Sequence, residues 1–191
     1  MSTSESKKIP RGRTSESKAR VVVVMGVSGS GKTTIGEQLA DVLGWPFYDA
    51  DDFHPAVNVE KMGRGEALTD ADRMPWLRAL RDLIARCLEE RTSAVLACSA
   101  LKAFYREVLT EGGGEAVVFV YLSGTRELIE ARLAARHGHF FDASLLESQF
   151  AVLEEPKDAI VVEIAGEPEA LVARIQEALH RLEAAEQDGE A

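Results

Sequence analysis

The chain has 191 residues, 46% of them hydrophobic, and a formal net charge of −10 at pH 7. This length fits one domain with a sizeable core. Residues 1–20 carry six Lys or Arg and two Glu, so the rest of the chain is strongly acidic. An acidic body argues against nucleic acid as the main partner, because phosphate-backbone binding needs a basic face. The basic first 20 residues are typical of a disordered tail, with contact to RNA or an anionic surface as the alternative.

Cysteine usage and hydropathy give further limits. Cys87 and Cys98 are too few for a disulfide framework and lack the spacing of metal ligands. The longest apolar run, Val21–Met25, is far shorter than the roughly 20 residues that cross a bilayer. The segment before it lacks the apolar stretch of a signal peptide. We therefore expect a cytoplasmic protein without a membrane partner.

Strands and helices alternate between the basic tail and a short acidic tail at residues 184–191. In chain order we expect a strand at Val21–Met25, a helix at Lys32–Leu43, a strand at Pro46–Ala50, a helix at 75–88 with Pro75 in its first position, a strand at Ala94–Cys98, a helix at Leu101–Thr110, a strand at Ala116–Leu122, a helix at Arg126–His137 that Thr125 caps, a helical stretch ending at Leu153, a strand at Ile160–Ile164 and a helix at Glu167–Ala184. This alternation predicts a three-layer α/β domain over residues 21–183, in which helices cover both faces of a five-stranded parallel sheet.

One motif connects the first strand to the first helix. Residues 26–33 match G-x-x-x-x-G-K-[ST] in full, in the strand–loop–helix context that this phosphate-binding loop requires. Its backbone N–H groups and the helix N-terminus bind phosphate oxygens, while the lysine reaches the β- and γ-phosphates and the threonine hydroxyl binds Mg²⁺. The sequence thus predicts an ATP and Mg²⁺ site formed by Gly26, Val27, Ser28, Gly29, Ser30, Gly31, Lys32, Thr33 and Thr34.

Two aspartates, Asp49 and Asp51, follow the expected second strand with a spacing of two residues. In an extended segment this spacing places both side chains on one side, and ligands bind beyond the carboxyl ends of the strands in such sheets. We assign Asp49 to Mg²⁺ together with Thr33, and Asp51 to orienting or deprotonating a substrate hydroxyl. A purely structural acidic turn is the alternative, and for Asp52 both interpretations stand equally.

Several further blocks give the chain a family likeness over residues 21–165. They are Met25–Lys32; Asp49–Pro55 with Asn58, Glu60–Met62 and Gly65; Leu68–Arg73 with Pro75–Leu77; Cys98–Lys102 with Tyr105 and Arg106; Gly138–Phe141; and Ser148–Phe150. In these blocks the sequence resembles the gluconokinases. It departs from them at Ala50, where glycine is expected, and at Val162–Ile164, where the strand end lacks an expected Asp.

The resemblance implies transfer of the ATP γ-phosphate to the 6-hydroxyl of D-gluconate, and it implies a dimer. Gluconate has hydroxyls and one carboxylate, so its site needs hydrogen-bonding groups and a cation. The candidate substrate ligands are Asp51, His54, Asn58, Lys61, Arg73, Ser99, Lys102 and Arg106. The pattern does not decide which of the four cations binds the carboxylate, and each of them also fits an ordinary helix surface.

The segment at about 137–153 resembles the lid of small kinases, which closes over ATP. Before it, Arg132 and Arg136 lie four residues apart on one helix face. We expect Arg136 to stabilise the transferring phosphoryl group, and Arg132 to contact adenine or a phosphate. Ordinary surface charge is the alternative for both.

Two other functions remain open at this stage. One is a different small-molecule kinase of the same architecture, such as a shikimate-type or nucleotide kinase. The other is a nucleotide-dependent regulator that binds nucleic acid through the basic tail. The GTPase class is disfavoured, because the chain has no N-K-x-D element for guanine.

Overall fold

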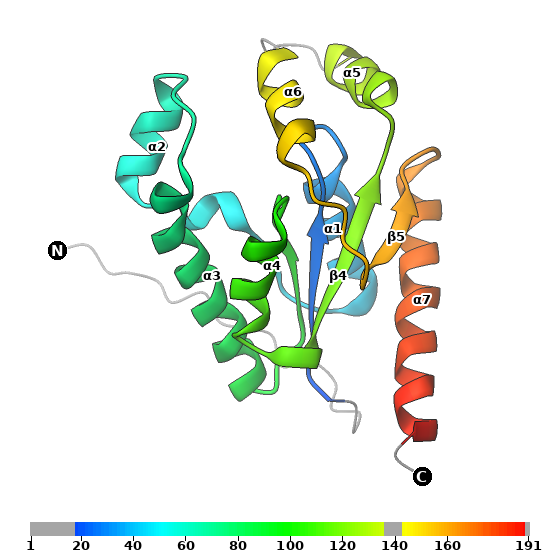
Figure 1. Cartoon of the computed structure of the whole chain (residues 1–191). Helices are drawn as coiled ribbons and strands as arrows, with labels where there is room; N and C mark the ends of the chain where they lie inside the picture. Colours follow the sequence, from blue (N-terminus) through cyan, green and yellow to red (C-terminus); the bar gives the residue numbers. More distant parts are fainter. Residues whose placement is uncertain (1–17, 136–142, 190–191) are drawn as a thin grey trace, which may run out of the picture.

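The computed structural model describes residues 18–135 and 143–189. Its centre is one parallel sheet of five strands, with helices on both faces (Figure 1). The strands are β1 (Val21–Met25), β2 (Phe47–Asp49), β3 (Ala94–Ala97), β4 (Val117–Ser123) and β5 (Ile160–Glu163). Their order in the sheet is β2-β3-β1-β4-β5. The predicted α/β architecture is confirmed.

Seven α-helices and two short 3₁₀ segments connect the described strands. The helices are α1 (Lys32–Leu43), α2 (Ala56–Gly63), α3 (Asp70–Glu89), α4 (Ala103–Thr110), α5 (Arg126–Ala135), α6 (Ala143–Val152) and α7 (Pro168–Gly189), and the 3₁₀ segments are η1 (Ala50–Phe53) and η2 (Gly114–Ala116). No helix in the described part of the chain is long and apolar enough to cross a membrane. The predicted N-cap at Thr125 is present, since its hydroxyl accepts a hydrogen bond from the backbone N–H of Leu128.

The alternating side chains of β1 build two separate cores. Val21, Val23 and Met25 pack with buried residues of α3 and α4 on one face of the sheet. Val22 and Val24 pack with buried residues of α1, α5 and α7 on the other. Successive strand side chains point to opposite faces, and here both faces are covered, so every residue of β1 is apolar and buried.

The sheet order places the phosphate loop at a topological switch point. The chain leaves β1 for β2 on one side, while β4 and β5 extend the sheet on the other. At the carboxyl edge, the backbone N–H of Gly26 bonds to the carbonyl of Ser99, which follows β3, at 3.4 Å. Loops that diverge at such a point leave a crevice where ligands bind. The fold therefore brings the ends of β1, β2 and β3 together around one site.

Helix α3 begins five residues earlier than predicted. Its N-cap is Thr69, which forms a capping box with Asp72, so Pro75 lies inside the helix and not in its first position. Proline there removes one backbone donor of the second turn. Helix α2 was not predicted at all, because its apolar residues Val57, Val59 and Met62 are exposed and form no core-facing stripe.

The structure differs from the expected tails at the described residues next to each of them. Arg20 is 5% exposed, and its guanidinium binds Glu186 while its backbone N–H donates to the Ser93 hydroxyl. Helix α7 continues to Gly189, so most of the stretch expected as an acidic tail is helical.

Candidate functional site

The loop between β1 and α1 adopts a backbone that favours glycine. Gly26 and Gly31 have φ angles of +147° and +96°. A Cβ on Gly26 would lie 2.9 Å from the Ser30 Oγ and 3.0 Å from the Leu122 carbonyl oxygen. Gly31 is the N-cap of α1, and within the described residues no side chain caps that end. The first-turn N–H groups of α1 are thus left for an anion.

Lys32 and Thr33 place a charge and a metal ligand beside this loop. The Lys32 Nζ donates to the Val27 carbonyl at 3.0 Å. The Thr33 Oγ1 donates to the Asp49 Oδ2 at 3.0 Å, so the loop touches the carboxylate at the end of β2. A hydroxyl and a carboxylate at this separation suit Mg²⁺, which takes few protein oxygens and completes its shell with water and phosphates. Among the described residues no group of three or more acidic, His or Cys side chains could hold a metal ion. The predicted Mg²⁺ site does not depend on such a group, because it has two protein ligands and takes the others from water and phosphates.

Asp51 reaches the same corner by a different backbone path than predicted. The chain does not stay extended after β2 but turns into η1, where the Asp51 backbone N–H donates to Asp49 Oδ1 at 3.1 Å. The argument from strand spacing is therefore wrong, although the backbone of Asp51 remains bonded to the Asp49 carboxylate. Burial raises the pKa of the Cys98 thiol, just beyond β3, to about 12, and the charges of Lys32, Asp51 and Asp49 act on it more weakly.

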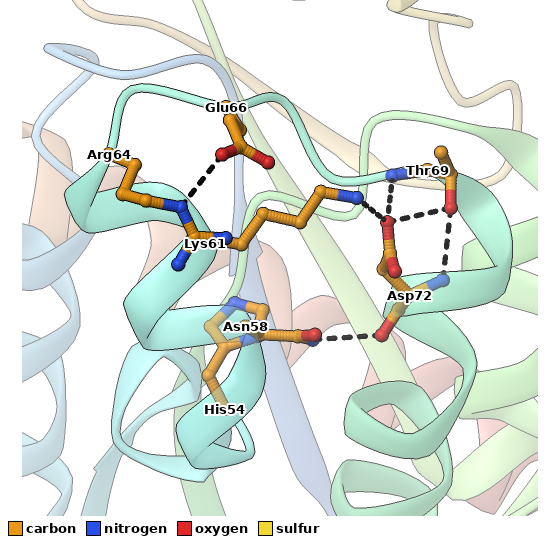
Figure 2. A network of polar contacts seen from close by, with 7 residues as sticks. All are labelled: His54, Asn58, Lys61, Arg64, Glu66, Thr69 and Asp72. Carbon is orange, nitrogen blue, oxygen red and sulfur yellow. Dashed lines mark hydrogen bonds and ion pairs between the residues drawn. The ribbon is translucent and has the colours of Figure 1, made fainter.

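An aromatic pair and a polar network form the wall beyond the acidic turn. The His54 ring stacks on Trp76 with centroids 4.5 Å apart and planes 9° from parallel. The Trp76 indole N–H donates to the Ala50 carbonyl at 2.7 Å, which fixes η1 to α3. Figure 2 shows Asn58 and Lys61 reaching from α2 to the start of α3. This wall connects the acidic turn, α2 and α3.

Two predicted substrate ligands are engaged inside this network. Asn58 is 2% exposed; its Nδ2 donates to the Asp72 carbonyl at 2.8 Å and lies 3.5 Å from His54 Nδ1. Lys61 Nζ bonds to Asp72 Oδ2 at 2.6 Å, and this contact together with Thr69 holds the pKa of Asp72 well below its usual value. Their substrate contacts remain predictions, but in this structure both residues position α2 against α3.

The remaining cations differ in how far they are already paired. Lys102 Nζ lies 2.8 Å from each oxygen of Asp70, which also accepts a hydrogen bond from the Tyr105 hydroxyl. Arg106 donates to the carbonyls of Ala100 and Leu101 at 2.9 and 3.2 Å.

Within the described chain the Arg73 guanidinium makes neither a hydrogen bond nor an ion pair, and it lies 6.0 Å from the centroid of the Tyr105 ring. The side chain is only partly exposed. Asp51 and Arg73 have opposite effects on His54. The negative charge of Asp51 raises the pKa of the ring, and the positive charge of Arg73 lowers it. Arg73 is therefore the cation best placed to accept a new carboxylate partner.

The stacked histidine should make stability depend on pH in a specific direction. Burial is the main cause that lowers the pKa of His54. As pH falls below about 6.5, the unfolded chain takes up a proton that the folded ring resists, so the free energy of unfolding decreases. We expect wild type to lose more stability between pH about 7.5 and about 5 than His54→Phe, which keeps the stack. Urea unfolding at both pH values measures this, and equal losses in the two proteins would contradict it.

A cavity of about 230 Å³ opens on the other side of the phosphate loop. It is lined by Gly29, Gly31, Thr34, Ile35, Arg132, Gly166, Pro168 and Leu171. Arg132 is held there by a hydrogen bond from its Nη2 to the Ile164 carbonyl. The predicted nucleotide ligands Thr34 and Arg132 thus meet at one cavity. The turn at 164–168 was missed, because nothing in its sequence marks it as part of a binding site.

Part of the expected lid lies outside the described residues. These include Arg136, His137 and His139, so the predicted role of Arg136 stays a prediction. Helix α6 is described, and its Gln149 bonds to Ser28 of the phosphate loop. Sequence reasoning used Gln149 only as part of a family block and assigned it no role. Tyr105, beside Arg73 and Asp70, was likewise noted without a role.

Comparison with known proteins agrees with this geometry. The family model described as shikimate kinase matches residues 28–180. A probable gluconokinase of Mus musculus is 43% identical over 178 residues, covering 83% of this chain and 97% of the mouse protein. The thermoresistant gluconokinase of Escherichia coli is 42% identical over 165 residues, covering 84% of this chain and 94% of that protein.

A solved structure extends the likeness to three dimensions. The crystal structure of a gluconokinase from Sinorhizobium meliloti has a TM-score of 0.82 and 38% identity, covering 91% of this chain and 99% of that one. The match to the shikimate kinase model, residues 28–180, includes most of the phosphate loop, the acidic turn and the wall of His54 and Trp76. The chain therefore belongs to the gluconokinase family of P-loop kinases.

Proposed function

We propose that this protein transfers the γ-phosphoryl group of ATP to the 6-hydroxyl of D-gluconate, giving 6-phospho-D-gluconate and ADP. The observation that carries the proposal is the 3.0 Å hydrogen bond between Thr33 Oγ1 and Asp49 Oδ2. It joins the phosphate loop to the turn that holds Asp51, and so brings phosphate ligands and a base for a hydroxyl to one corner. Curated relatives named gluconokinases support the choice of substrate.

Each residue at this corner has a task in the transfer. The oxygen of the 6-hydroxyl forms a bond to the γ-phosphorus, the bond from that phosphorus to the bridging oxygen breaks, and ADP leaves with that electron pair. Asp51 accepts the hydroxyl proton and later releases it to water. Lys32 stabilises the charge that spreads over the phosphoryl oxygens. Thr33 and Asp49 would hold Mg²⁺, which when bound neutralises charge on the phosphates.

The far end of the substrate meets the α3 wall. Arg73 offers a planar pair of donors that matches a carboxylate, while Lys102 is already paired with Asp70. We assign the gluconate carboxylate to Arg73 and its hydroxyls to His54 and Ser99. On the nucleotide side, Arg132 and the 164–168 turn would border adenine, and Arg136 would stabilise the phosphoryl group.

A substrate panel tests the assignment. We expect ATP-dependent ADP release with gluconate to exceed that with shikimate or nucleoside monophosphates by about 10²-fold or more in kcat/KM, since a site built for particular polar groups rejects analogues strongly. Mass spectrometry of the product should show one added phosphoryl group. Equal rates with shikimate, or activity on a nucleotide acceptor alone, would overturn the choice of gluconate.

Location and partners complete the proposal. Both cysteines are free and buried, and the chain outside its first 20 residues is acidic. We propose a cytoplasmic enzyme that acts without nucleic acid and forms dimers. A variant that begins at residue 18 keeps the anchored Arg20, so full kinase activity in it would assign the basic tail no catalytic role. Sedimentation measures the dimer, and a nucleic-acid retention assay with the full chain tests the tail.

A further inference from the structure

Gln149 lies on the face of α6 that otherwise packs against the core. Leu146 is 2% exposed, and Phe150 and Leu153 pack against the same apolar cluster. Positions 146, 149 and 150 fall on one stripe of α6, and Leu153 follows the helix directly. Gln149 is only partly exposed, and a polar side chain that gives up part of its contact with water is stabilised by hydrogen-bond partners. Gln149 finds both of its partners on the phosphate loop.

The Gln149 carboxamide bonds twice to one residue. The Ser28 backbone N–H donates to Oε1 at 2.6 Å, and Nε2 donates to the Ser28 Oγ at 2.9 Å. The N–H partner requires the oxygen of the amide at its position, which leaves the nitrogen for the hydroxyl. The pair thus uses the donor and the acceptor of the carboxamide together. It also orients the backbone of a loop whose function depends on where its N–H groups point.

The bonded N–H belongs to the same peptide group that Lys32 contacts. The Val27 carbonyl accepts from Lys32 Nζ at 3.0 Å, and the N–H of this peptide, on Ser28, donates to Gln149. Carbonyl and N–H point in opposite directions in a trans peptide, so the lysine and the glutamine hold the group from two sides. Lys32 serves the β- and γ-phosphates in this motif. Gln149 therefore fixes, from the opposite side, the same peptide of the loop that the phosphate-binding lysine contacts.

The segment after α6 is fixed to the substrate side of the site. The Glu154 backbone N–H bonds to the Leu101 carbonyl at 2.9 Å. The Glu154 Oε2 accepts from the backbone N–H of Ala103, the first residue of α4, at 2.7 Å. Lys102 is adjacent to that residue. Helix α6 thus has one hydrogen-bonded anchor on the phosphate loop and another next to the residues assigned to gluconate.

We propose that Gln149 is a positioning residue for phosphoryl transfer, because its two bonds to Ser28 fix α6 over the terminal-phosphate end of the loop and keep water away from it. The inference rests on the proposed kinase function, but not on which sugar acid is the acceptor. Without these bonds, α6 keeps its apolar packing and its Glu154 contacts, but the phosphate loop at Ser28 is no longer held against α6 and becomes accessible to water. Water then competes with the acceptor hydroxyl, and its attack on the γ-phosphorus gives ADP and inorganic phosphate.

The test compares Gln149→Ala, Gln149→Glu and, as a matched control, Glu147→Ala, which changes an exposed residue of the same helix. For each folded protein, both products are measured: phosphorylated acceptor and inorganic phosphate. We expect Gln149→Ala to lower kcat about tenfold and to raise the share of phosphate severalfold, with the gluconate KM within about twofold. Gln149→Glu loses the Nε2 donor and adds a negative charge beside the phosphates, so its ATP KM should rise as well. Glu147→Ala should match wild type.

Hydrogen exchange separates this inference from the proposed function. With ATP bound, the peptide containing residues 27–34 should exchange faster in Gln149→Ala than in wild type, whatever the acceptor is. If the wild type does not phosphorylate gluconate but exchange in residues 27–34 is still faster in Gln149→Ala, the assignment of gluconate as substrate is overturned while the role of Gln149 in holding the phosphate loop stands. An unchanged product ratio together with unchanged exchange in Gln149→Ala would overturn the positioning role.

Discussion

Replacing Asp51 with asparagine should lower kcat for gluconate by about 10²–10⁴-fold, the range that a positioned general base contributes. Asparagine keeps the size and the hydrogen bonding of the side chain but cannot take the proton of the hydroxyl. The KM for ATP should stay within about twofold, because the phosphate loop and the Thr33–Asp49 contact do not involve this side chain. Steady-state kinetics with both substrates varied measures the two effects separately.

The matched control for this variant is Asp52→Asn. Both residues are exposed members of η1 and carry the same charge, so a general effect of acidity on the turn would appear equally in both. We expect Asp52→Asn to keep at least about half of the wild-type kcat. Asp51→Asn with full turnover would remove Asp51 from the transfer step, and equal losses in both variants would assign the effect to the turn.

Replacing Arg73 with alanine should raise the KM for gluconate about 10²-fold with little change in the KM for ATP. A bidentate pair between guanidinium and carboxylate contains two charge-assisted hydrogen bonds, each worth about 1.5–3 kcal/mol. Arg73→Lys should recover only part of the loss, because lysine lacks the planar fork. The control is Arg78→Ala, an exposed arginine on the same helix.

An acceptor without a carboxylate makes this test specific. A neutral six-carbon polyol should be a poor substrate for wild type, and Arg73→Ala should lower its kcat/KM by no more than about twofold. An equal loss with gluconate and the polyol would show that Arg73 shapes the site without binding the carboxylate. An unchanged gluconate KM in Arg73→Ala would shift the assignment to Lys102.

Local sequence patterns predicted the part of the fold that depends on local chemistry. β1 and α1 have the predicted bounds, because a run of β-branched residues ends in the glycines of the phosphate loop and the helix stops at Gly44. The predicted start of α3 was wrong, because the helix begins at the Thr69–Asp72 capping box and accommodates Pro75 in its second turn.

Contacts between distant residues could not be predicted in the same way. The phosphate loop and Asp49 were identified from motifs, but nothing local indicates that Gln149 bonds to Ser28 across 121 positions. The pairing of Lys102 with Asp70 depends on how α3 and α4 pack. Among the four candidate cations, it leaves Arg73 as the one whose charged group makes neither an ion pair nor a hydrogen bond within the described residues. Sequence reasoning supplied the four candidate cations, and only the packing ranks them.

Trp76 belongs to the buried interior and supports, from behind, the wall that we assign to the sugar acid. Its ring is 1% exposed and carries His54 on one face, and its N–H holds the turn of Asp51. A change that enlarges this side of the site to admit bulkier acids therefore opens a hole in the interior, at a cost of about 3–5 kcal/mol for Trp→Ala. Engineering of a broader acceptor range should thus begin with a stabilised parent or leave the indole in place and vary the exposed side of α2.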